Sequence, residues 1–268
     1  MDTMTNTIEK LNGFIDKGND LLKSKPSSLA LELKRVVDAE SHRIKFDNTI
    51  EDKFTEDKKM RRDFAKQALK IAAELKDEYV SVGKEATTLA RKELLNKPAV
   101  PSDDLLTAEF ALDLKKLKIK ASIKMTGDEL EQQLESLLAK YPDKYFANEL
   151  YEAYDTLSAS VLVANGDTQT RKKLASTFEQ LENAALTEEQ QTAKGAITYF
   201  GDYENTQLFK DFLQPYDGLT RAIGGQYAKY FNDGRAGLEA IEIEEREEFE
   251  RENASLIARG ERVSRLSL

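Results

Sequence analysis

The segment between Pro26 and Pro98 contains 71 residues with no proline and a single glycine, Gly83. Proline breaks a helix interior and glycine weakens it, so a long segment poor in both is typical of helices. Apolar residues recur there at steps of three and four, as on one face of an amphipathic helix. The most regular series runs through Phe64, Ala68, Ile71, Leu75, Tyr79, Val82, Ala86 and Leu89.

A less regular apolar stripe precedes this series, with interruptions at 47–48 and 55–59. We predict two long helices between these prolines, nearly continuous with each other, with Ser27 or Ser28 capping the start of the first. A shorter helix precedes them. Helices of this length usually pair as a hairpin or as a coiled coil. The region 1–100 is therefore expected to form an elongated N-terminal arm.

The segment 96–104, NKPAVPSDD, is the best linker in the chain, because it holds two prolines. It predicts a domain boundary, and Ser102 is placed to cap the helix that follows. Nine of the ten tyrosines and six of the twelve phenylalanines lie between 141 and 231, so bulky core material is concentrated there. The region 101–233 is expected to be a compact bundle of helices.

Regularly spaced signals for helix starts and helix ends support the prediction of a bundle. Two capping boxes, each a threonine followed three residues later by Glu or Gln, predict helix starts at Thr126 and Thr187. Further short helices are expected over 204–213 and 216–231, with Pro215 between them. Elements of this length joined by short turns are typical of a helical bundle.

The segment 117–125 is ambiguous. It alternates apolar and polar residues, which is the pattern of a strand with one solvated side. It also continues a helical series that runs through Phe110, Leu114, Leu117, Ala121 and Met125. Because the chain offers no second alternating run as a pairing partner, we prefer the helix.

The region 234–268 is predicted to be a charged C-terminal helix with a basic tail. Eight glutamates lie between 239 and 252, and arginines then alternate with apolar residues. The tail is either a frayed terminus or a docking segment that folds on an acidic partner surface. The candidate partner-binding residues are Leu256, Ile257, Arg259, Arg262, Val263, Arg265 and Leu266.

Composition excludes the catalytic chemistry that needs cysteine or several histidines. The chain has no cysteine and one histidine, which removes thiolate sites, disulfides and multi-histidine metal sites. His42 could act as a base beside Glu40, but a lone histidine on a long helix is more often a surface residue. No Glu-x-x-His motif for a di-iron site occurs. We predict no catalytic residue, no metal ligand and no cofactor.

Other candidate sites have simpler interpretations. The glutamates of 239–252 could bind a divalent cation, but a run on one helix radiates around its axis and is more typical of a solvated acidic face. The glycines at 224–225 and at 234 and 237 match no phosphate-loop motif, so close helix packing or a kink is favoured. Basic strips at 58–62 and 115–124 lack aromatic residues that could stack on bases, and are read as solvated helix faces.

Charge and hydropathy limit the partners. The net charge of −9 makes general nucleic-acid binding unlikely, because such binding depends on lysine and arginine. No secretory signal and no apolar run of about 20 residues is present, so we expect no membrane partner. We expect the protein in the cytoplasm of a host cell or within an assembled virion, with protein partners, through self-association or a larger assembly.

In overall style the chain resembles the helical structural and morphogenesis proteins of tailed bacteriophages, including scaffolding proteins. These are acidic, poor in cysteine and built from long helices, often with a basic C-terminal segment that contacts the coat. Here the matching residues are Arg259, Arg262 and Arg265. The resemblance implies a non-enzymatic structural or assembly protein, in a virion or in head morphogenesis. The alternatives are a regulatory module that binds one protein partner, and a carboxylate-dependent metal hydrolase.

Overall fold

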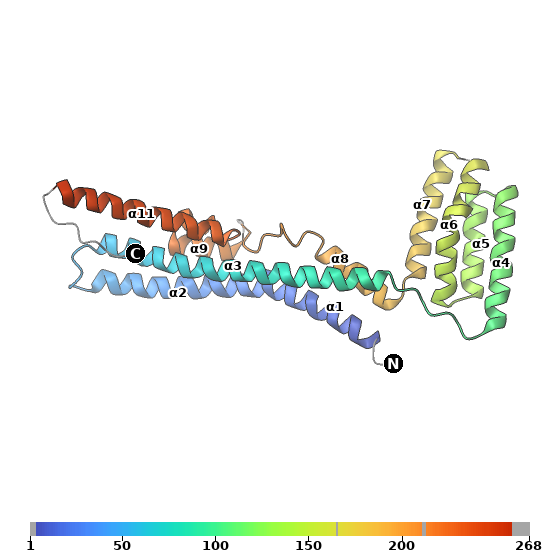
Figure 1. Ribbon diagram of the computed structural model, residues 1–268, viewed down its shortest axis with the longest axis horizontal. Coiled ribbons are helices and arrows are strands. Elements are labelled where there is room, and N and C mark those ends of the chain that lie inside the picture. Colours follow the sequence, from blue (N-terminus) through green and yellow to red (C-terminus); the bar gives the residue numbers. More distant parts are fainter. Residues whose placement is uncertain (1–3, 165, 211–212, 259–268) are drawn as a thin grey trace. The chain divides into compact units, whose positions relative to one another are not determined.

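The computed structural model describes residues 4–164, 166–210 and 213–258, and within them every regular element is a helix (Figure 1). The all-α prediction is confirmed. The elements are α1 (Met4–Asn19), the π-helical turn η1 (Asp20–Ser24), α2 (Lys25–Phe46), α3 (Lys53–Leu94), α4 (Asp104–Ile123), α5 (Gly127–Lys140), α6 (Lys144–Ala164), α7 (Thr168–Ala185), α8 (Glu188–Tyr199), α9 (Gln214–Ile223), α10 (Gly225–Ala228) and α11 (Gly234–Ala258).

The described chain forms two compact units. One unit combines 4–13 with 86–201, and the other combines 14–85 with 202–258. Both therefore include parts of α1 and α3, and the chain returns from the first unit to the second after Gly201. The packing contacts divide the chain after residues 13, 85 and 201. The boundaries expected from the sequence lie elsewhere, near 100 and 233, at the proline-containing linker and at Gly234.

Helices α4 to α7 pack as a four-helix bundle in the first unit (Figure 1). Its core is made of leucines and aromatic residues, with Phe110 in edge-to-face contact with Tyr141 at 5.2 Å between ring centroids. Both predicted capping boxes are present, at Thr126 with Glu129 and at Thr187 with Gln190. Side chains that cap backbone N–H groups fix where each helix begins.

The preference for a helix over 117–125 is confirmed up to Ile123, where α4 ends. The prediction that Ser102 caps this helix is wrong. Asp103 is the cap, and its carboxylate accepts a hydrogen bond from the backbone N–H of Leu106 at 3.0 Å. An ionised cap is favoured at a helix N-terminus because it also offsets the positive end of the helix dipole.

In the second unit, the chain runs from α1 through η1 into α2 without leaving helical geometry. The prediction of a cap at Ser27 or Ser28 is therefore wrong. Pro26 sits in the first turn of α2, and the Ser27 hydroxyl donates to the Lys23 carbonyl at 2.8 Å. The π-helical turn accommodates the proline, because a wider turn leaves room for a ring that lacks an N–H.

A loop over 47–52 separates α2 from α3, as the first expected interruption indicates. The second expected interruption, at 55–59, is wrong because these residues are helical. Asp52 caps α3 by accepting a hydrogen bond from the backbone N–H of Thr55 at 3.0 Å. The polar run after Phe54 is thus the first turns of α3 and not a break.

The expected helix over 204–213 is wrong for its described part, which forms turns and bends. Lys76 of α3 holds this segment, since its ammonium group donates to the carbonyl oxygens of Glu204 and Thr206, each at 2.7 Å. The expected helix over 216–231 is divided at Gly224, whose φ of +92° favours glycine and ends α9.

Candidate interaction surface

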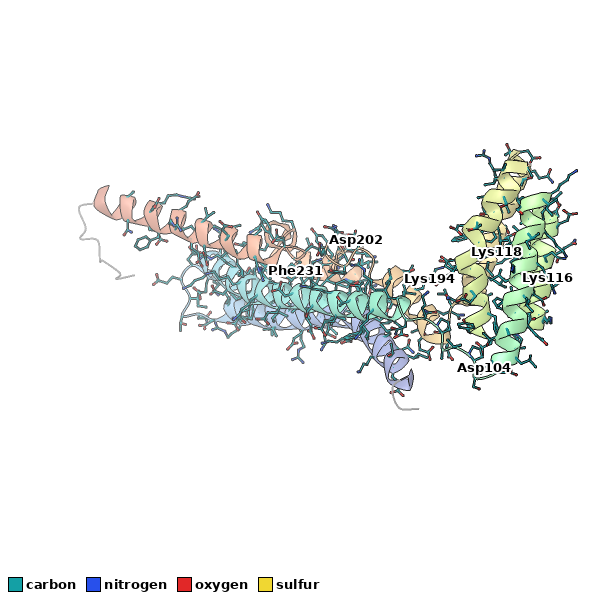
Figure 2. The ribbon with its side chains drawn as sticks, turned by 45° about the vertical axis from the view of Figure 1, so that its right-hand side comes forward. Asp104, Lys116, Lys118, Lys194, Asp202 and Phe231 are labelled. Carbon is teal, nitrogen blue, oxygen red and sulfur yellow. The ribbon has the colours of Figure 1, made fainter. Side chains whose placement is uncertain are left out.

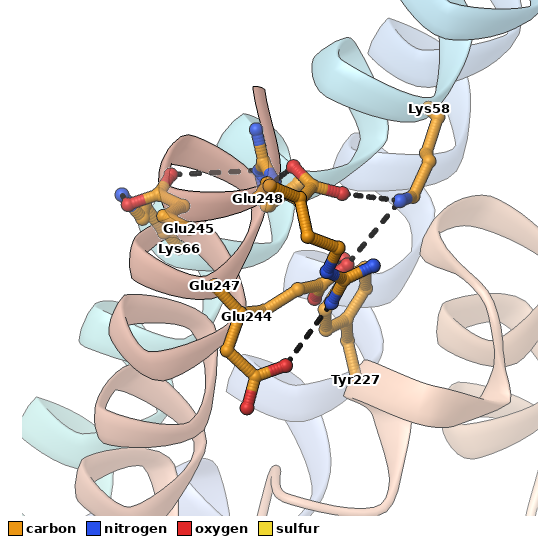
Figure 3. Close-up of polar contacts among 9 residues, drawn as sticks. Lys58, Lys66, Tyr227, Glu244, Glu245, Glu247 and Glu248 are labelled. Carbon is orange, nitrogen blue, oxygen red and sulfur yellow. Dashed lines mark hydrogen bonds and ion pairs between the residues drawn. The ribbon is translucent and has the colours of Figure 1, made fainter. Parts of the chain in front are cut away.

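Glutamates of α11 pair with cations of α3 in the second unit (Figure 3). Lys58 Nζ lies 2.5 Å from Glu248 Oε1, and Lys66 Nζ lies 2.5 Å from Glu245 Oε2. Arg62 lies between them and forms ion pairs with both glutamates. Residues four apart share one helix face, so the three cations of α3 meet the acidic row of α11 along two turns.

This arrangement shifts the ionisation of its members. Hydrogen bonds from Lys58 and Arg62 hold the pKa of Glu248 below its ordinary value of 4.5. The Tyr227 hydroxyl donates to Glu244 at 2.9 Å, and burial together with that carboxylate raises the pKa of Tyr227 to about 12. The prediction of a solvated acidic face is therefore wrong for these glutamates, which are partly buried and paired. Their role is to hold α11 against α3.

The glycines at the start of α11 have the packing role that the sequence analysis favoured. A Cβ at Gly234 would collide with the carbonyl oxygen of Leu69, and one at Gly237 would lie 2.7 Å from Cβ of Tyr230. Only glycine lets the two backbones approach this closely. The paired charges and the close backbone contact together account for the position of α11 on α3.

Helix α4 carries an apolar surface with no partner among the described residues. Four large aliphatic side chains on its outer side are 51–78% exposed. They are Leu105, Leu112, Ile119 and Ile123, here called the outer stripe. Single exposed apolar residues are common on protein surfaces, but apolar residues that recur along one side of an exposed helix are typical of a helix that pairs with another.

The outer stripe follows from the residue spacing in α4. Its first three members recur every seven residues, which is close to two helical turns, so they stack in one row. A second apolar row on the opposite side of α4 is buried in the bundle core, and consists of Phe110, Leu114, Leu117 and Ala121, here called the inner stripe. Helix α4 is thus apolar on two faces, and only one of them is covered.

Charges flank the outer stripe. Asp104 begins α4, and Lys116 and Lys118 lie in its second half (Figure 2). Asp113 is bonded by Lys116, Lys140 and the Tyr141 hydroxyl, which hold its pKa well below the usual range. Within the described chain no ion pair engages Asp104, Glu109, Lys115 or Lys120. These exposed charges are available to a partner.

The candidate docking residues of the C-terminal tail lie at the edge of the described residues or outside them. Leu256 and Ile257 fall in the last turn of α11, where side chains lie outside the described residues. Residues Arg259, Arg262, Val263, Arg265 and Leu266 lie outside the described residues altogether. They remain predictions. His42 is exposed on α2 and packs against the Phe46 ring at 4.5 Å between centroids, as expected of a surface histidine.

Sequence reasoning missed the outer stripe, although its signal was in view. The alternation over 117–125 combines Leu117 and Ala121 of the inner stripe with Ile119 and Ile123 of the outer stripe. A period of two can thus arise on a helix that has apolar rows on opposite sides. The spacing of seven residues from Leu105 to Leu112 and Ile119 distinguishes such a helix from a strand.

No protein-family model, curated protein or solved structure matches this chain. In the part of the chain that the structure describes, no helix is long and apolar enough to cross a membrane. The same residues contain no group of three or more His, Cys, Asp or Glu side chains that could hold a metal ion.

Proposed function

We propose that this chain is a non-enzymatic structural protein that joins a larger assembly through contacts between helices. The outer stripe of α4 is the observation that carries this proposal. Fully burying an exposed leucine or isoleucine side chain contributes about 1.5–3 kcal/mol, and α4 leaves four such side chains 51–78% exposed, so each can still contribute part of that amount. A partner that covers this row gains that stabilisation, and the flanking charges orient it.

The resemblance to structural proteins of tailed bacteriophages suggests the kind of assembly. An acidic, cysteine-free, helical chain with a basic C-terminal segment suits a virion or head-morphogenesis component. In this proposal Arg259, Arg262 and Arg265 supply a second contact with an acidic partner, separate from the outer stripe. The protein would then act in the cytoplasm of the host or inside the particle.

Sedimentation of native lysates tests the proposal. The wild-type protein and Leu112→Glu are each expressed in the cells that naturally make the protein, and gradient fractions are probed for the chain. Ala111→Glu is the matched control, because it adds the same carboxylate at an exposed neighbour outside the outer stripe.

We expect wild type and Ala111→Glu to sediment with particles far heavier than the 30.3 kDa chain, and Leu112→Glu to move to the light fractions. Wild type confined to light fractions, or Leu112→Glu sedimenting like wild type, would contradict the proposal.

A further inference from the structure

The charges of α4 are sorted along its length. Residues 103–113 contain four acidic and no basic side chains, and residues 114–124 contain five basic and no acidic ones. The acids are Asp103, Asp104, Glu109 and Asp113, and the bases are Lys115, Lys116, Lys118, Lys120 and Lys124. The helix is thus acidic in its first half and basic in its second, with the outer stripe running through both.

A helix sorted in this way is complementary to itself in the antiparallel direction only. Parallel pairing sets acid against acid and lysine against lysine, whereas antiparallel pairing sets each half against its opposite. A contact in which both copies use the same patch also closes as a two-fold dimer.

We propose that the partner of the outer stripe is α4 of a second copy of this chain, paired antiparallel about Leu112. This inference rests on the proposed function and names the partner of the same surface.

The spacing in α4 sets the register of the pair. With Leu112 on the two-fold axis, Leu105 lies level with Ile119 of the second copy, because both are seven residues from the centre. Glu109 and Lys116 are also seven residues apart, so they lie in one row next to the line through Leu105, Leu112 and Ile119, and Ile123 continues that row. A two-fold axis perpendicular to both helices keeps that row on the same side in each copy.

Glu109 therefore meets Lys116 of the second copy, and the contact occurs twice. Lys116 also bonds Asp113 at 3.0 Å, but its side chain is 68% exposed and can reach across the contact. Glu109 has no ion pair within the described residues. The two contacts flank an apolar centre, which is the usual arrangement in paired helices.

Other occupants fit less well. An anionic membrane attracts the lysine half of α4 but repels the half with Asp104 and Glu109. A uniformly acidic helix likewise complements one half only. Because the contact uses one helix of 20 residues from each copy, it is a small interface, and we expect dimerisation at about micromolar concentration.

The test uses the full chain and two charge reversals, Glu109→Lys and Lys116→Glu, with the mass measured by sedimentation over a range of concentrations. Each variant alone places two like charges at both contacts, so we expect dimerisation about tenfold weaker than in wild type. An equimolar mixture of the two variants restores attraction at both contacts, so mixed dimers form with wild-type affinity. Leu112→Glu, which places two carboxylates on the axis, remains monomeric.

Disulfide formation between introduced cysteines tests whether the two α4 helices pair antiparallel, since the chain has no cysteine of its own. A mixture of Leu105→Cys and Ile119→Cys should cross-link rapidly, and Leu105→Cys alone slowly. Rapid cross-linking of Leu105→Cys alone would overturn the antiparallel pair.

Three results would each overturn the inference. The first is a purified wild-type protein that stays monomeric at all concentrations, and the second is a dimer that persists in Leu112→Glu. The third is a mixture of the two charge-reversal variants that dimerises no better than either variant alone. A monomer that binds vesicles of anionic phospholipid through α4 would also overturn it. If purified protein is monomeric while its sedimentation in native lysate still depends on Leu112, the proposed function stands and this inference fails. If neither form of association depends on Leu112, both fail.

Discussion

Leu117 and Ile119 are two residues apart on α4, yet they lie on different sides of the helix: Leu117 is 3% exposed in the bundle core, and Ile119 is 51% exposed on the outer stripe. Two residues along a helix correspond to about 200° of rotation, so this pair marks the two apolar faces. One face is buried by the fold of the chain, and the other stays exposed.

The two faces should respond differently to truncation. Leu117→Ala leaves a cavity among packed side chains and should lower the free energy of unfolding by about 2–5 kcal/mol. Leu112→Ala removes a side chain that is already in water and should change it by less than about 0.5 kcal/mol. Urea unfolding of dilute protein measures both, and equal losses would show that the outer stripe is packed within the chain.

Gly234→Ala should destabilise the unit that holds α11. The added methyl group collides with the Leu69 carbonyl oxygen, which is backbone and cannot swing aside, so α11 must move away from α3. We expect a loss of about 1–3 kcal/mol in thermal or urea unfolding. Gly13→Ala is the control, because a Cβ at Gly13 meets nothing within 4 Å and alanine favours a helix by up to about 1 kcal/mol. A Gly234→Ala protein with the same free energy of unfolding as wild type would refute the close contact.

Acid should weaken the pairing of α3 with α11. The pKa of Glu248 is lowered in the folded state, so its stabilising contribution is complete above its ordinary value of 4.5 and is lost as the pH falls through the folded value. Glu248→Gln should therefore cost about 1 kcal/mol at pH near 7 and progressively less below pH about 4.5. Glu250→Gln, at an exposed site on the same helix, is the control and should change the free energy of unfolding by less than about 0.5 kcal/mol. Parallel pH profiles for the two variants would be inconsistent with the charge network.

Alkali should destabilise both units through two buried tyrosines. Burial raises the pKa of Tyr154 to about 12, and its hydroxyl donates to the Leu174 carbonyl at 2.7 Å. Burial also raises the pKa of Tyr227 to about 12. Because both values lie above the ordinary 10.0, their contribution to stability is complete below pH 10 and is lost as the pH rises towards 12.

Titration of phenolate absorbance in folded protein measures this effect. Tyr154→Phe and Tyr227→Phe should each remove one late-ionising group from the curve. Curves unchanged by either substitution would show that these hydroxyls are not buried.

Local signals in the sequence predicted local structure. The capping boxes at Thr126 and Thr187 gave correct helix starts, because the bonds that define them lie within four residues. Ser102 was wrong because the adjacent Asp103 competes for the same cap with a full charge. The helix expected over 204–213 was wrong in its described part, where the carbonyl oxygens of Glu204 and Thr206 accept hydrogen bonds from Lys76, more than 120 residues away in the chain.

The pairing of α3 with α11 could not be predicted for the same physical reason. Lys58 and Glu248 are 190 residues apart, and each run of charge by itself is equally consistent with a solvated face. The outer stripe, in contrast, can be recognised in the sequence from the seven-residue spacing of Leu105, Leu112 and Ile119. The alternation over 117–125 hides it, because a strand and a helix with apolar rows on two sides give the same pattern there.

Labelling of single cysteines tests most directly whether the outer stripe is covered by a second copy. The cysteine-free chain allows Leu112→Cys on the stripe and Lys118→Cys on the same helix, about 120° around its axis from Leu112, each treated with a maleimide in dilute and in concentrated protein. The account predicts that labelling of Leu112→Cys slows at high protein concentration, while Lys118→Cys reacts at the same rate in both. Equal rates for Leu112→Cys at the two concentrations would contradict it.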